Sequence, residues 1–339
     1  MEELFLRFPH IGEKIMDQLE NADLTDCRMV NPFWKSCIDG QKVVWMRVIY
    51  QWLEINQDWQ NIYKVLNVDM VRILANAVHK FYTDGGDEES ERYKTPIEIA
   101  AIIGNTEIVA KLFKKEAFEN QGSTKNEHGL PFHIAAKYGQ FDVCKFFLDN
   151  IEDKNPKEML DNMTPLHYAA RHGHFVICRM ILQKIDDKNP ATKEICGGYT
   201  PLHEAAEKNH LAVCRLIMNS LVDKNPRDSI GLTPLHYASR DGHLGLCLSI
   251  LLNIKEKNPK DDDGKTPLHH AVEKGHNEIC RLIIEYADDK NPGDMNARTA
   301  FHDAAERGNL EICQLMIENL HGELPGDNYD FTPLNAAIF

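Results

Sequence analysis

From residue 95 to the last residue, one pattern of apolar and polar positions repeats along the chain about every 33 residues. Its clearest mark, Thr-Pro-Leu-His, begins at Thr164, Thr200, Thr233 and Thr266, and weaker copies begin at Thr95, Leu130, Thr299 and Thr332. The steps between the eight starts are 35, 34, 36, 33, 33, 33 and 33 residues. A fixed period of this length indicates stacked structural units, each too small to bury its own apolar face.

Each unit predicts two helices joined by a tight turn. Thr followed by Pro is typical of a helix start, because the hydroxyl caps free backbone N–H groups and Pro fits the first helical position. Nine positions later stands Gly or, once, Asn209, and both residue types tolerate the left-handed backbone that ends a helix. A second helix follows, with apolar residues 13, 14, 17 and 18 positions after the first residue of the unit. The motif Asp-Lys-Asn-Pro ends this helix.

These motifs together resemble the ankyrin repeat over residues 95–339. The resemblance implies an all-α solenoid of helix pairs with short hairpin fingers, made of seven repeats and a partial eighth. Two positions depart from the family pattern, because Glu98 stands where His is expected and Ala297 where the finger usually has Gly. The partial repeat ends on Ile338-Phe339, so it is either a cap, the end of a fragment or a face that packs on something else. Residues 51–94 predict a helical connector with an acidic loop.

Cysteines and histidines recur at fixed offsets, which favours a framework role over catalysis or metal binding. One Cys lies in six of the second helices and one His in the first turn of six of the first helices. A catalytic side chain is needed once, whereas buried free Cys is common in helices. Neighbouring helices pack roughly 8–10 Å apart, which is too far for a disulfide. We therefore predict no catalytic residue, no metal ligand and no cofactor.

The first 50 residues do not repeat and predict three short helices. Pro9 opens the first helix, Asp23 can cap the second, and the third begins near Trp34. So short a segment cannot enclose a full core alone, so its many apolar side chains are candidates for a partner surface.

The same segment resembles the F-box, through the ordered residues Phe8-Pro9, Ile11, Leu19, Asp23-Leu24, Val30, Trp34 and Trp45. It lacks one residue after Pro9, and Asn31 replaces the usual Cys. The resemblance implies docking onto the Skp-type adaptor of cullin ubiquitin ligases through Pro9, Ile11, Ile15, Leu19, Leu24, Val30 and Trp34. The alternative is a helical cap that only shields the first ankyrin repeat.

The net charge of the chain limits the classes of partner that we expect it to bind. Thirty-eight Lys and Arg against 52 Asp and Glu give a formal net charge of −14. So acidic a chain is a poor ligand for nucleic acid or anionic membranes, because binding there depends on basic side chains. The start of the chain lacks the basic and apolar runs of a secretory signal, and we expect a cytoplasmic or nuclear protein.

Protein binding is the function that the array predicts. In ankyrin repeats the variable positions are the finger tip, which we expect just before Thr, and the positions 4, 7 and 8 residues after Thr on the first helix. Tyr and Arg are enriched at binding hot spots. We therefore predict target contacts at Tyr138, Met163, Tyr168, Arg171, Tyr199, Leu232, Tyr237 and Arg240. The leading hypothesis is a non-catalytic substrate receptor of a cullin ligase, in which the F-box-like segment docks the adaptor and the array binds an unknown target. The alternative is a scaffold or competitive binder with no ligase link.

Overall fold

The structure is a computed structural model that describes residues 96–119, 130–320 and 324–338. The chain divides into two compact units, residues 1–125 and 126–339. In the first unit, α7 (Pro96–Ile103) and α8 (Thr106–Glu119) form one helix pair around the predicted turn at Gly104, whose φ is +80°. The predicted F-box-like segment and the whole of the predicted connector lie outside the described residues.

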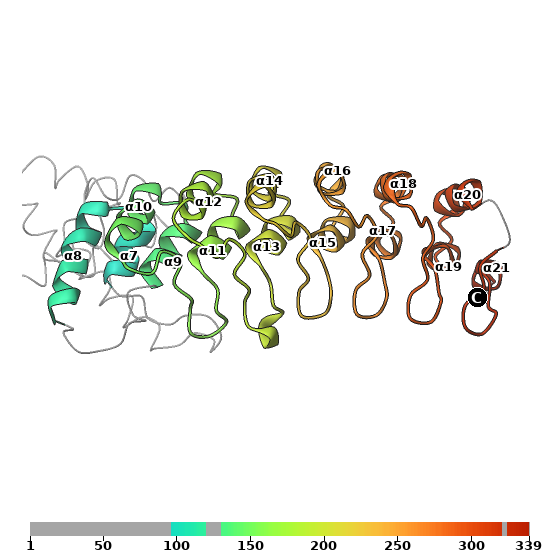
Figure 1. The fold of residues 1–339 in the computed structure, drawn as a ribbon, viewed down its shortest axis with the longest axis horizontal. Coiled ribbons are helices and arrows are strands. Elements are labelled where there is room, and N and C mark those ends of the chain that lie inside the picture. Colours follow the sequence, from blue (N-terminus) through green and yellow to red (C-terminus); the bar gives the residue numbers. More distant parts are fainter. Residues whose placement is uncertain (1–95, 120–129, 321–323, 339) are drawn as a thin grey trace, which may run out of the picture. The chain divides into compact units, whose positions relative to one another are not determined.

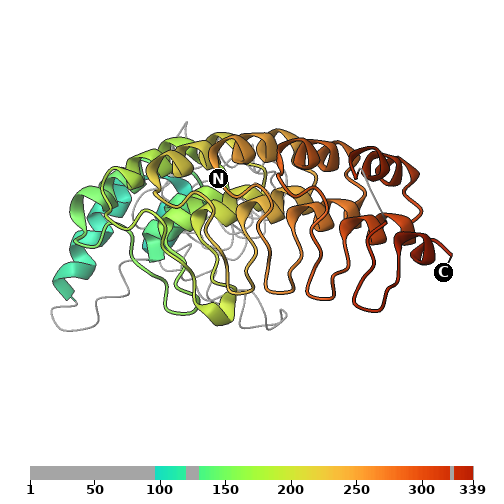
Figure 2. The same ribbon diagram turned by 45° about the vertical axis from the view of Figure 1, so that its right-hand side comes forward.

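The second unit is a stack of helix pairs, as the repeat period predicts (Figure 1). The first helices are α9 (Leu130–Lys137), α11 (Pro165–Arg171), α13 (Pro201–Glu207), α15 (Pro234–Arg240), α17 (Pro267–Lys274), α19 (Ala300–Glu306) and α21 (Pro333–Ala336). The second helices are α10 (Phe141–Asn150), α12 (Phe175–Leu182), α14 (Leu211–Ser220), α16 (Leu244–Asn253), α18 (Asn277–Tyr286) and α20 (Leu310–Asn319). The two sets form two layers, and the fingers project from the layer of first helices (Figure 2).

The core lies between the two layers. It is built from the small residues of the first helices and from the apolar face of the second helices, as in Ala205, Ala206, Cys214 and Ile217, each 0% exposed. Within the described parts of the chain no helix is long and apolar enough to span a membrane.

The fingers are irregular hairpins that an aspartate organises. In one of them Asp228 Oδ1 accepts hydrogen bonds from the backbone N–H groups of Ile230 and Leu232, and Gly231 adopts a left-handed φ of +77°. Ala297 takes the equivalent turn position of its finger with φ +58°, although a side chain costs energy there. Neighbouring fingers are joined by single backbone hydrogen bonds, among them Ser229 N–H to Gly197 O, Asp262 N–H to Ile230 O and Met295 N–H to Asp263 O.

The Asp-Lys-Asn-Pro motif connects successive units. Asp187 Oδ1 accepts a hydrogen bond from the Asn189 N–H, which forms the turn. Lys188 Nζ donates to the carbonyls of Leu182 and Ile185, so a cation lies at the C-terminal end of α12, where it is favourable. The motif therefore ends one helix and directs the chain into the next finger.

Candidate protein-binding surface

Five of the first helices, α11, α13, α15, α17 and α19, begin with a capping box made by Thr and His. The backbone N–H of Thr200 donates to Nδ1 of His203 at 3.2 Å, and the Thr200 hydroxyl lies 2.9 Å from the same nitrogen. The other ring nitrogen, Nε2, bonds to the carbonyl of Leu232 in the next finger at 3.1 Å. The same arrangement recurs at His167, His236, His269 and His302. Each of these histidines therefore joins its helix start to the following repeat.

These bonds fix the tautomer of the five histidines just named, which we call the framework histidines. A backbone N–H can only donate, so Nδ1 must be the acceptor, and Nε2 carries the proton that it donates to the next carbonyl. Burial disfavours the charged imidazolium and lowers the pKa of His167 and of His203 to about 4, and that of His236 to about 3. The framework histidines are structural, as their repetition in register predicts.

A second series of histidines lies at the start of the second helices and points to the preceding repeat. His174, His210, His243 and His276 bond through Nε2 to the carbonyls of Lys137, Arg171, Glu207 and Arg240, at 3.0 to 3.1 Å. Three of these rings lie over the turn glycine of the preceding repeat, where a Cβ on Gly173 would come within 2.6 Å of the His210 ring. The two series therefore link the repeats in opposite directions.

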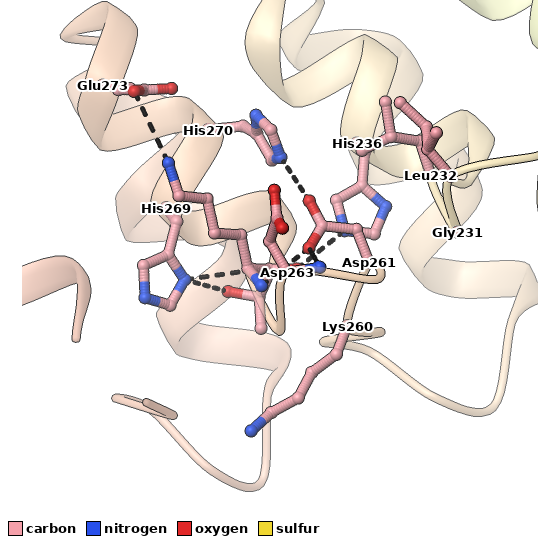
Figure 3. Close-up of polar contacts among 12 residues, drawn as sticks. Gly231, Leu232, His236, Lys260, Asp261, Asp263, His269, His270 and Glu273 are labelled. Carbon is pink, nitrogen blue, oxygen red and sulfur yellow. Dashed lines mark hydrogen bonds and ion pairs between the residues drawn. The ribbon is translucent and has the colours of Figure 1, made fainter. Parts of the chain in front are cut away.

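One cluster in the described part of the chain has the composition of a metal site, and its hydrogen bonds argue against one. The ligand atoms of His236, Asp261 and His270 lie within 4.8 Å of one another (Figure 3). His236 Nδ1, however, accepts the Thr233 N–H at 3.0 Å, so its Nε2 is protonated and has no free lone pair for a metal. Asp261 Oδ2 accepts the Nε2–H of His270 at 3.1 Å. We therefore assign this cluster to the structure of the finger.

The recurrent cysteines also belong to the core. Cys178, Cys214, Cys247 and Cys280 are buried, and burial raises the pKa of each thiol to about 12. A thiol held so strongly in its protonated form is a poor nucleophile and a poor metal ligand. This placement supports the prediction that they serve as small apolar residues.

Three of the predicted target contacts are buried, which corrects the predicted surface. Met163 and Leu232 are 8% exposed and Tyr237 is 2% exposed. The residue just before Thr lies at the base of the finger and not at its tip. Its backbone carbonyl there accepts the hydrogen bond from the histidine of the preceding repeat. The Tyr237 hydroxyl donates to Asp228 Oδ2 at 2.7 Å, so its polar group is satisfied inside the repeat. We leave these three side chains out of the binding surface.

The other predicted contacts lie at the surface of the first helices and fingers, and several are held in place by neighbours. Tyr138 is 40% exposed. The Tyr168 hydroxyl donates to Glu158 at 2.8 Å. Arg171 reaches the next repeat, where it pairs with Glu204 at 3.2 Å.

Further along the same surface, Arg240 lies over the Tyr237 ring, 4.8 Å from its centroid, and pairs with Asp241 at 2.9 Å. Tyr199 is half-buried, with its ring centroid 5.8 Å from that of Tyr237. Burial raises the pKa of Glu204 while Arg171 opposes the shift. Tyr168, Arg171 and Arg240 are already held by neighbouring side chains, so they would lose little conformational freedom when a target binds.

Sequence reasoning missed the residues that do form the finger tips. Met159, Leu160, Ile195, Ile230 and Met295 are 65%, 72%, 91%, 57% and 70% exposed. The turn residues with positive φ, such as Gly231 and Gly264, precede Thr by two positions and mark where each finger turns back. A Gly two positions before Thr is therefore the sequence signal that indicates where such a finger turns.

The geometry therefore defines a stack of repeats in which the recurrent Thr, His and Cys side chains of the described residues serve the framework. The family profile described as "Ankyrin repeats (3 copies)" matches residues 65–158, 132–228 and 215–294. These matches cover more than half of the chain, and the chain belongs to the ankyrin repeat family. Ankyrin repeats are binding modules for other proteins, so the chain has a role in protein–protein interaction. No curated protein matches the chain.

Proposed function

We propose that this protein is a receptor that brings a target protein to a Skp-type adaptor of a cullin ubiquitin ligase, in the cytoplasm or the nucleus. The ordered side chains across α9–α15, above all the Arg171–Glu204 pair between repeats and Arg240 over Tyr237, support target binding on this face. Prearranged aromatic and Arg side chains are typical of binding hot spots. The adaptor part rests on the F-box-like order of apolar residues in residues 1–50.

The mechanism is proximity and needs no chemistry from this chain. Holding a target beside a ligase raises the effective concentration of its lysines near the loaded carrier enzyme. A scaffold that binds a target without a ligase is the alternative, and adaptor binding separates the two.

The adaptor test uses the full chain and purified Skp-type adaptor. We expect the wild type and the control Leu4→Asp, which lies ahead of the F-box-like pattern, to retain the adaptor. Leu19→Asp should lose it, because a carboxylate cannot be buried cheaply in an apolar contact. Failure of the wild-type chain to bind would remove the ligase from the proposal and leave the scaffold.

The target test is enrichment of partners by the full chain followed by mass spectrometry. Tyr138→Ala combined with Arg240→Ala should weaken capture of the target by roughly thirtyfold, the usual scale for losing hot-spot residues. Gln314→Ala, on the layer of second helices, serves as the control. Equal capture by both variants would place the target elsewhere on the chain.

A further inference from the structure

Helix α16 differs from the other described second helices because it contains no charged residue. At the position of Leu248, four of the other helices carry a cation, namely Lys145, Arg179, Arg215 and Arg281, and α20 carries Gln314. At the position of Leu252, the other second helices of the second unit carry only polar or acidic residues: Asp149, Gln183, Asn219, Glu285 and Glu318. Two solvent-facing positions that are polar in the other second helices of the second unit are therefore leucine in α16, whereas α8 of the first unit carries Ala110 at the position of Leu248.

These leucines form an exposed apolar stripe. Leu244, Leu248 and Leu252, spaced by four residues on one helix face, are 44%, 38% and 61% exposed. Gly245 lies beside them, and a Cβ added there would meet nothing within 4 Å, so the helix surface is low and open. The core does not need these side chains, because Leu246, Cys247, Ile250 and Leu251 already fill the space below α16. An exposed stripe of this kind is typical of an interface.

The charges of the neighbouring helices change sign across α16. On one side, α12 and α14 each contain one arginine and no acidic residue. On the other side, α18 and α20 contain Glu278, Glu285, Glu311 and Glu318, and their one arginine, Arg281, pairs with Glu311 at 2.7 Å. An apolar helix thus separates a weakly basic flank from an acidic flank.

We propose that this face binds a second copy of the chain, with α16 packed on α16. A two-fold axis parallel to the helix reverses the order of the stack, so α14 of one copy faces α18 of the other and α12 faces α20. The basic flank then meets the acidic flank on both sides, as a self-complementary interface requires. In this arrangement Arg215 of one copy lies at the same height along the helix axis as Arg281 of the other copy, which is already paired with Glu311. Glu278 and Glu285 lie above and below that height on the same helix as Arg281. The other two-fold arrangement, with antiparallel helices, would place flanks of like charge together.

The test measures the mass of the full-length protein by sedimentation equilibrium over roughly 1–100 µM, a range that resolves micromolar dimers. We expect a reversible dimer. Leu248→Arg should raise its dissociation constant about 100-fold or more, because each copy loses one buried leucine and gains a charge. The substitution should leave the fold intact, since Arg occupies the same position in three of the other second helices. Ile230→Arg, at a finger tip, is the control and should leave the dimer unchanged.

A charge swap tests the orientation of the two copies. Arg215→Glu alone should weaken the dimer about tenfold, and adding Glu285→Arg should recover most of the loss. A wild-type chain that remains monomeric, or a dimer that Leu248→Arg leaves intact, overturns the proposed interface. A swap that weakens the dimer further overturns the proposed orientation.

Discussion

The layer of first helices and the layer of second helices both use histidine to join repeats, but they use it differently. In the first layer His203 is 0% exposed and serves the Thr200 cap and the Leu232 carbonyl at once. In the second layer His210 is half-buried and makes a single bond, to the Arg171 carbonyl. The same side chain is therefore part of the core where it satisfies two buried groups, and it makes a weaker link between repeats where water reaches it.

The two layers should also differ in how well they tolerate amino-acid substitutions. The starts of the first helices repeat the same residues, because each must complete the cap and reach the next finger. The exposed positions of the second helices vary among Lys145, Arg179 and Leu248, because nothing in the core depends on them. Stability should therefore reside in the first layer, and the following tests measure that difference.

Acid should have the largest effect, because it acts on several framework histidines together. Their pKa in the folded protein, about 4 for His167 and His203 and about 3 for His236, is below the unfolded value of 6.5. The unfolded chain therefore binds protons first as the pH falls below 6.5, and stability is lost from there down to about pH 4 or 3. Each imidazole contributes about 1.4 kcal/mol per pH unit within that window.

The measurement is the midpoint of thermal unfolding from pH 7.5 to pH 4. A midpoint that stays constant between pH 6.5 and pH 4.5 would contradict the buried neutral state of these side chains. Carboxylates titrate mostly below this range, so the upper part of the window reports on the histidines.

Replacing one histidine in each layer gives the next largest contrast. His203→Ala leaves the Thr200 N–H and the Leu232 carbonyl without partners in the core and creates a cavity, so we expect a loss of about 3 kcal/mol or more. His210→Ala removes one partly exposed bond, so we expect about 1 kcal/mol. Urea unfolding of the full chain measures both. Equal losses would mean that burial does not separate the two series.

The turn glycines give the smallest and most sharply controlled test. Gly173 and Gly275 share a φ of +75°, but a Cβ on Gly173 would come within 2.6 Å of the His210 ring and one on Gly275 would meet nothing within 4 Å. Gly275→Ala should cost about 1 kcal/mol from backbone strain alone. Gly173→Ala should cost about 2–3 kcal/mol, because His210 must also move. Combining Gly173→Ala with His210→Ala should give less than the sum of the two losses in urea unfolding.

The repeat geometry could be predicted from the sequence because its signals are local. Thr-Pro at a helix start and Gly at a helix end act within a few residues, so Thr200 and Gly173 marked their elements directly. The binding surface was harder, because burial depends on the neighbouring repeat. Tyr237 was predicted to be a target contact, yet its hydroxyl bonds to Asp228, nine residues earlier in the finger. The His270–Asp261 pair has the same separation of nine residues, so an aspartate in the finger indicates that the side chain nine positions later is held within its own repeat.

The longest step in the repeat, from Thr164 to Thr200, leaves the helices in register. Its extra residues fall in the finger, where η2 (Glu194–Cys196) forms a separate turn that protrudes beyond the neighbouring tips (Figure 1). Length added at this place is therefore absorbed without disturbing either helix layer. A short epitope or a fluorophore-binding peptide inserted between Ile195 and Cys196 should thus be displayed outside the array, giving a handle for imaging the folded protein.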